Sequence, residues 1–112
     1  PTLEFQLPCA PWVALEGPVE GIWTKTLAED QESGDYTRLL RFDPGVNTTE
    51  QATRIHPYWE EVFILEGDLT DIRLGQTFGK GMYACRPPGM PHGPWSTESG
   101  VLMLEICCQT RV

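Results

Sequence analysis

The stretch "RIHPYWEEVFILEGD", residues 54–68, carries the strongest strand signal of the chain and one of its two histidines. Residues 61–65 are rich in aromatic and β-branched side chains, and Glu-Gly-Asp at 66–68 is a turn signal. The pattern predicts a β-strand over 61–65. The alternative is a helix with Pro57 at its first position and acidic residues in its first turn. The Val-Phe-Ile run and the absence of a polar face count against that helix.

Similar short segments flank this stretch on both sides. They alternate apolar and polar residues or are rich in strand-forming residues, and Gly, Pro or Asp bounds them. These predicted strands are residues 21–30, 36–42, 69–74, 82–86 and 100–109. Turns or loops are expected at residues 31–35, 43–45, 46–53, 75–81 and 87–94. Many short, closely spaced strands predict an all-β sandwich or barrel, with residues 1–20 as an irregular, proline-rich lead-in.

Length and charge narrow the class of protein. The 112 residues fit one domain. The net charge of -8 argues against binding to nucleic acid or to anionic membrane surfaces, since both are bound by basic patches. No apolar run approaches the ~20 residues that span a membrane. The four cysteines include no CxxC pair, which argues against a structural zinc cage or a redox dithiol. We expect thiols that act as small buried apolar groups in a reducing cytoplasm.

The two histidines raise a geometric question. On one continuous strand His56 and Glu60 would lie about 13 Å apart, at ~3.3 Å per residue. Two ligands of one metal ion need their donor atoms only about 3 Å apart. A shared site therefore requires a bend, for which Pro57-Tyr58-Trp59 is suited, placing His56 and Glu60 on neighbouring strands. His92 follows a proline-stiffened turn and is expected to start the next strand.

The spacing of these residues resembles the two motifs of the cupin superfamily. His56, Glu60 and Gly67 match H-x3-E-x6-G. The second motif, G-x5-P-x-G-x2-H, is matched by Gly81, Pro87, Gly89 and His92. The chain resembles small cupins such as the zinc-binding domain of ChrR-type anti-sigma factors and acetylacetone-cleaving dioxygenases. The resemblance implies a cupin-type jelly-roll β-barrel, a single cupin domain over 1–112 with its core at about 36–108, and often a homodimer.

The resemblance also implies one divalent metal ion (Fe, Zn, Ni or Mn) at His56, Glu60 and His92. The chain departs from the motif at Arg54, which stands where a first histidine is usual, and in a longer loop at 46–53. A guanidinium cannot bind a metal. In one interpretation two imidazoles and a carboxylate remain, the donor set of non-haem iron enzymes, with Gln51 as a possible fourth oxygen ligand. In the other, the site holds no metal and Arg54 pairs with Glu60.

Other polar and aromatic residues have open roles. Arg54 either anchors an anionic substrate beside the metal or points into solvent. Tyr58 and Trp95 either contact substrate or pack the turn and the pocket wall. Glu105 interrupts an apolar run, so it is either exposed at an edge or inside the cavity near a cation.

Three further charged residues are assigned to the surface. Glu61 follows the proposed ligand Glu60 and is expected on the opposite face of its strand, in solvent. Arg38 and Arg41 lie on opposite faces of one strand, so at most one of them can face the cavity. We expect a surface position for each.

The function expected from these features is a metal-dependent enzyme of the oxygenase, lyase or isomerase type. It would act on a small oxygenated substrate resembling an enol, a diketone or a carboxylate, and with iron it could be a dioxygenase. The alternative is a non-catalytic metal- or ligand-sensing cupin module. The ChrR-type proteins carry a second domain for which this chain has no room, which favours a free-standing enzyme. The sequence does not identify catalytic residues.

Overall fold

The computed structural model describes residues 8–51 and 55–109, and these form eight β-strands and one short 3-10 helix. The strands are β1 (Val13–Ala14), β2 (Ile22–Glu29), β3 (Tyr36–Phe42), β4 (Trp59–Asp71), β5 (Gln76–Gly79), β6 (Tyr83–Arg86), β7 (Trp95–Ser96) and β8 (Val101–Cys108). The 3-10 helix η1 (Thr49–Gln51) lies in the predicted polar loop. The all-β prediction is confirmed, and the helix alternative for the opening stretch is wrong.

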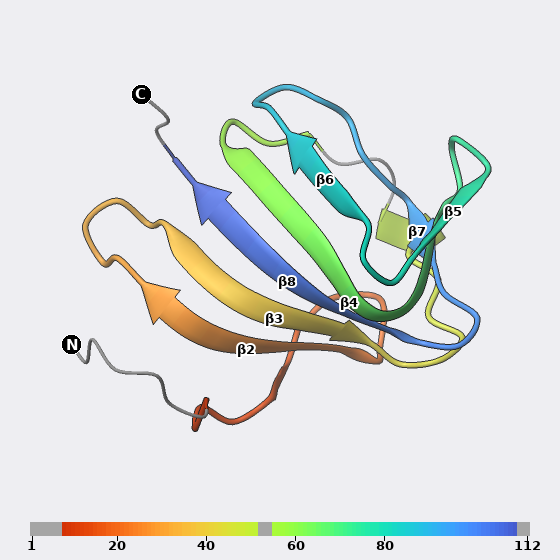
Figure 1. The fold of residues 1–112 in the computed structure, drawn as a ribbon, viewed down its shortest axis with the longest axis horizontal. Coiled ribbons are helices and arrows are strands. Elements are labelled where there is room, and N and C mark those ends of the chain that lie inside the picture. Colours follow the sequence, from red (N-terminus) through yellow and green to blue (C-terminus); the bar gives the residue numbers. More distant parts are fainter. Residues whose placement is uncertain (1–7, 52–54, 110–112) are drawn as a thin grey trace.

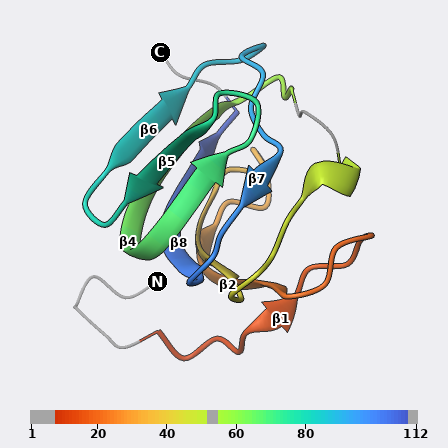
Figure 2. The same cartoon turned by 90° about the vertical axis from the view of Figure 1, so that its right-hand side faces the viewer.

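All strand pairs are antiparallel, in the order β1-β2-β3-β8-β4-β5, with β6 and β7 also paired to β4. Strands β2, β3, β8, β4 and β6 form one curved layer, and β5 and β7 lie at its right-hand end (Figure 1). The view turned by 90° shows β4 curving from this layer toward β5 and β7 (Figure 2). The first part of β4 pairs with β8 and β6 and its last four residues pair with β5, so one strand serves both layers.

The predicted turn at 66–68 is wrong, because β4 runs unbroken from Trp59 to Asp71. Its pairing with β8 shifts register between Ile64 and Glu66, and Gly67 has a φ of 87°. A bulge and a left-handed glycine bend a strand without ending it. The turn lies further on, at residues 72–75, so the strand predicted at 69–74 ends early, and the loop predicted at 75–81 contains β5. The predictions for β2, β3, β6 and β8 are confirmed within one or two residues at each end.

The barrel interior changes from apolar to charged along its length. The core cluster comprises Ile22, Leu40, Phe42, Val46, Val62, Ile64, Leu69, Val101 and Met103. Inward-facing partners on β3 and β8 are Phe42–Val101, Leu40–Met103, Arg38–Glu105 and Tyr36–Cys107, in order along the strands. The first two pairs belong to the core, and the last two carry polar groups. The polar side chains of these pairs therefore lie at the end of the barrel that holds Arg38 and Glu105.

Two further observations concern the cysteines and the hydropathy of the helices. All four cysteines are free thiols; Cys107 is buried and Cys9 is exposed. In the described residues no helix is long and apolar enough to cross a membrane.

Candidate metal centre

The two histidines come together from two loops. His56 lies in the connection before β4, and residues 57 and 58 form a bend. His92 lies in the loop between β6 and β7. The loops are joined by a hydrogen bond in which the Gly89 N–H donates to the His56 carbonyl, at 3.0 Å. The predicted bend is confirmed, but His56 stands on the connection itself and not on a neighbouring strand.

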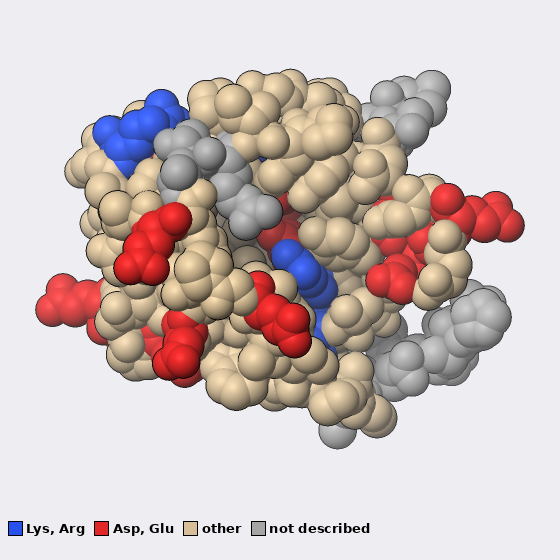
Figure 3. All heavy atoms as spheres, turned by 180° about the vertical axis from the view of Figure 1, so that it is seen from behind, with Lys and Arg blue, Asp and Glu red and all other residues tan. Residues whose placement is uncertain are grey.

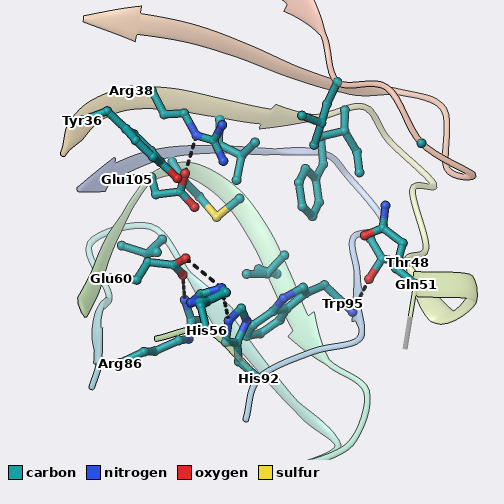
Figure 4. A pocket seen from close by; sticks show the side chains of 18 of the residues that line it. Tyr36, Arg38, Thr48, Gln51, His56, Glu60, Arg86, His92, Trp95 and Glu105 are labelled. Atoms are coloured by element: carbon teal, nitrogen blue, oxygen red, sulfur yellow. Dashed lines mark hydrogen bonds and ion pairs between the residues drawn. The ribbon is translucent and has the colours of Figure 1, made fainter. Parts of the chain in front are cut away.

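His56, Glu60 and His92 converge on one point (Figure 4). The Nε2 atoms of the two histidines are 2.7 Å apart, and His56 Nε2 is 3.5 Å from Glu60 Oε2. One ligand atom from each residue lies within 4.8 Å of the others. Ligand atoms of one ion with bonds near 2.1 Å lie about 3 Å apart, so the separations of 2.7 Å and 3.5 Å fit a divalent ion. Two imidazoles and a carboxylate suit iron, zinc, nickel or manganese.

Among the described residues Arg86 is the charged group nearest to Glu60, and the sequence interpretation missed it. Its Nη1 lies 2.7 Å from Glu60 Oε1, and both residues are buried. The two residues are direct cross-strand partners on β6 and β4, so their side chains share the interior face. The Arg86 guanidinium also lies 4.8 Å from the centre of the Trp95 ring. Arg86 thus holds one carboxylate oxygen and leaves Oε2 facing His56.

Two predicted aromatic residues border the histidines. The Tyr58 ring stacks on His56, with centroids 4.3 Å apart and an interplanar angle of 8°. The Trp95 ring lies 6.1 Å from His92, and the Trp95 backbone N–H donates to Thr48 Oγ1 at 2.8 Å. Both aromatic side chains line the same cavity as the histidines. Their contact with a substrate stays a prediction, since both also pack against the histidines.

The cavity has a volume of about 490 Å³ and lies inside the barrel. Residues 15–18 of the proline-rich lead-in line part of it, as does Gln51 on η1. Figure 4 places Gln51 beside Thr48, away from the histidines, so Gln51 is not positioned as a further ligand. Arg54, the predicted substrate anchor, lies outside the described residues, and so does the ion pair expected between Arg54 and Glu60.

A second ion pair, between Arg38 and Glu105, lines the cavity as well. The predicted surface position of Arg38 is wrong, whereas Arg41, on the opposite face of β3, lies outside the cavity and is partly exposed beside Asp43. Of the two positions left open for Glu105, the structure has the one inside the cavity near a cation. Burial raises the pKa of Glu105, and the Arg38 guanidinium counteracts this by stabilising the carboxylate.

Other assignments on the outer face fit the sequence. The Glu61 side chain points away from the cavity, where it accepts a hydrogen bond from the Tyr83 hydroxyl. Inside, burial and then the Glu105 carboxylate raise the pKa of Tyr36, so this phenol stays protonated. The alternation of β3 would have found Arg38, because it shares a face with Leu40 and Phe42.

The barrel and the paired histidine motifs define a cupin. The chain belongs to the family described as the ChrR Cupin-like domain, whose sequence profile matches residues 5–108. A comparison with curated proteins gives no significant match.

Solved structures share the fold at low identity. An acetylacetone dioxygenase from Acinetobacter johnsonii aligns with a TM-score of 0.74 and 18% identity, over 96% of this chain and 75% of that chain. The polyketide cyclase RemF from Streptomyces resistomycificus aligns with a TM-score of 0.74 and 17% identity, over 98% and 82%. KdgF from Halomonas sp. aligns at 0.69 and 18%, over 90% and 87%. These similarities confirm the expected cupin jelly roll.

Proposed function

We propose that this protein is a metal-dependent cupin enzyme that binds one divalent ion, Fe, Zn, Ni or Mn, through His56, Glu60 and His92. The substrate is a small oxygenated molecule, of the enol, diketone or carboxylate type, held in the barrel cavity. The observation that carries the proposal is the convergence of three ligand atoms within 4.8 Å at the wall of that cavity. The names of two structures with this fold, an acetylacetone dioxygenase and a polyketide cyclase, support small oxygenated substrates.

In this proposal the side chains of the site have separate roles. A bound ion supplies Lewis-acid polarisation of an enol or carbonyl oxygen. Arg86 orients the Glu60 carboxylate, and the stacked Tyr58 ring fixes the plane of His56. Trp95 and the apolar side chains of the cavity exclude water, which strengthens each charge interaction inside. The oxygenase, lyase or isomerase type depends on the ion and on the substrate.

Metal binding is tested by elemental analysis of untagged protein and by calorimetric titration with Zn²⁺ and Mn²⁺. The parent is expected to bind one ion, and Glu60→Gln or His92→Ala is expected to lose most of the affinity. Glu61→Gln is the matched control, because Glu61 is the neighbouring carboxylate on the opposite face of β4. A parent that binds no ion, or a Glu61→Gln loss equal to that of Glu60→Gln, contradicts the proposal. Activity is tested by oxygen uptake and substrate loss with acetylacetone.

The second candidate is a non-catalytic metal- or ligand-sensing module, which the resemblance to the cupin domain of ChrR-type anti-sigma factors supports. The two functions differ in turnover. An enzyme consumes a diketone or enol and loses this activity in Glu60→Gln. A sensor binds the ion or the ligand, changes its stability or assembly, and returns the ligand unchanged.

We also propose a cytoplasmic single-domain protein that forms a homodimer. A row of apolar side chains crosses the outer face of the large layer, with Tyr83, Phe63, Leu104 and Leu39 as successive cross-strand partners. Phe63 and Tyr83 are among the exposed large side chains. Covering this row in a two-fold contact would bury it. Light scattering should give a dimer that Phe63→Asp converts to a monomer; a monomeric parent at all concentrations would exclude the dimer.

A further inference from the structure

The cavity contains a second polar group across from the histidines, formed by Arg38 on β3 and Glu105 on β8. We propose that Arg38 is the binding site for a substrate carboxylate, which makes the substrate a small organic acid with an oxo or enol oxygen. The acid group binds Arg38 while the oxygenated carbon faces His56, Glu60 and His92. This inference rests on the proposed function and narrows its substrate class.

The position of Arg38 follows from the register of the barrel. Arg38 and Glu105 are direct partners of β3 and β8, and the next pair toward the core is Leu40–Met103. Arg38 therefore stands at the boundary between the apolar core and the polar end of the interior. Figure 4 shows the Arg38–Glu105 pair on one side of the cavity and the histidine cluster on the other. A ligand that fills the space between them contacts both groups.

The way Arg38 is held leaves its terminal nitrogens available. Glu105 is bound through the Arg38 Nε, and the Tyr36 ring lies 4.8 Å from the guanidinium carbon. Within the described part of the chain no further hydrogen bond of Arg38 is found. The two Nη groups form the fork that binds a carboxylate bidentately. An arginine fixed at Nε loses little side-chain freedom when a carboxylate binds, which favours recognition.

Of the two described arginines that line the cavity, Arg38 is also the more accessible. Its side chain is 23% exposed, against 10% for Arg86, which is covered by the Trp95 ring. Seen from behind, the surface has a hollow in which basic atoms are visible between acidic residues (Figure 3). Burial lowers the pKa of Arg38, but Glu105 and Tyr36 outweigh this and raise the pKa overall, so the guanidinium stays charged. A carboxylate that enters the cavity meets this cation beside Glu105 and the Tyr36 ring.

The competing explanation is that the pair only stabilises the barrel. Buried ion pairs contribute little stability compared with well-packed apolar residues, and the neighbouring cross-strand pair is apolar. A purely structural role would affect all ligands equally through the fold. An anchoring role affects only ligands that carry the acid group. The two explanations are separated by ligands that differ in the carboxylate alone.

Acetoacetate and acetylacetone are such ligands, because one terminal methyl of the diketone is replaced by the acid oxygen. We would titrate both into the parent, into Arg38→Lys and into Arg41→Lys, following cavity tryptophan fluorescence and calorimetry. Arg38→Lys keeps a positive charge beside Glu105 but removes the fork, so acetoacetate affinity should fall about tenfold. Acetylacetone affinity should stay within about twofold. Arg41→Lys, on the outer face of the same strand, should change neither.

A double variant, Arg38→Gln with Glu105→Gln, removes both charges and keeps a hydrogen-bonding pair. It leaves no buried charge without a partner, so it tests the inference even where a single variant fails to fold. It should lose the preference for acetoacetate while retaining the circular dichroism spectrum of the parent. The inference is overturned if the parent binds acetoacetate no better than acetylacetone, or if Arg38→Lys keeps the acetoacetate affinity or loses both ligands equally. Zn²⁺ titration of the same proteins reports on the proposed metal site separately, since Arg38 is not among its ligands.

Discussion

Replacing Gly67 by alanine should be one of the most damaging single changes in the barrel. Gly67 adopts a φ of 87°, and a Cβ built there would lie 1.9 Å from the Gly100 carbonyl oxygen and 2.9 Å from Val101 Cα. Both neighbours are backbone atoms of the segment that leads into β8, so no side-chain rotation relieves the clash. Relief requires moving β4 away from β8 at the point where the Asp68 N–H donates to the Gly100 carbonyl, at 3.2 Å.

The expected loss sums three effects. The left-handed conformation costs a residue with a Cβ about 1 to 2 kcal/mol, the strained hydrogen bond about 1 kcal/mol, and the forced shift of packed backbone about 1 to 3 kcal/mol. We expect Gly67→Ala to lower the free energy of unfolding by about 3 to 6 kcal/mol. Gly75→Ala is the control, because its φ is 68° and no atom lies within 4 Å of the built Cβ. It should cost only about 1 to 2 kcal/mol.

Urea unfolding followed by circular dichroism measures both variants, and equal slopes in urea make the comparison valid. A Gly67→Ala loss within about 0.5 kcal/mol of the Gly75→Ala loss would show that the close approach of β4 and β8 is not the cause.

Three further predictions concern charged residues. Arg86→Met should weaken Zn²⁺ binding about 10- to 100-fold in calorimetry, because Arg86 fixes the Glu60 carboxylate; unchanged affinity would contradict this. Hydrogen bonds, the largest contribution coming from Ser99, lower the pKa of Asp68 below its ordinary value of 3.8. The Asp68 carboxylate therefore stabilises the fold fully above pH 3.8, and this stabilisation is lost as the pH falls through the lowered pKa. Parent and Asp68→Asn should therefore converge in stability on acidification, and a constant gap would refute the linkage. Arg54→His should tighten Zn²⁺ binding by supplying the usual first histidine of the motif. Weaker binding would show that position 54 does not correspond to that histidine.

Much of the barrel was predictable because each strand carries its own period-two pattern and its own turn signals. The strand at residues 36–42 is bounded by Gly-Asp and by Asp-Pro-Gly, and it begins and ends as predicted. The bend in β4 was not predictable in this way. Glu-Gly-Asp has the same local chemistry in a turn and in a bulge, and only the pairing of Gly67 with Val101 on β8 decides between them.

The candidate site, like the fold, was predictable from the sequence only in part. The motif spacing identified His56, Glu60 and His92, which the structure brings together. It did not identify Arg86, because a single arginine at the end of a short strand has no local signal. Its role follows from standing directly opposite Glu60 across the β4–β6 ladder, which is a long-range pairing.

The charges inside the cavity connect the proposed ion with the proposed substrate. Glu60 and Arg86 neutralise one another, as do Glu105 and Arg38, so the described interior is close to neutral before any ion binds. Neutral imidazoles do not offset a divalent ion, which then leaves an excess of positive charge beside apolar walls. Unpaired charge is unfavourable in such surroundings, so an anionic ligand should bind more tightly once the ion is present.

This coupling gives the last prediction. Loading the parent with Zn²⁺ should raise its affinity for acetoacetate by about tenfold or more, since one favourable charge contact in a partly buried site contributes at least 1.4 kcal/mol. Binding linkage requires that acetoacetate raise the Zn²⁺ affinity by the same factor, so two independent titrations must agree. Acetylacetone, uncharged at neutral pH, should show a smaller factor. If Zn²⁺ leaves the acetoacetate affinity unchanged while both bind, the ion and the acid occupy electrostatically separate sites, and the cavity does not join them as proposed.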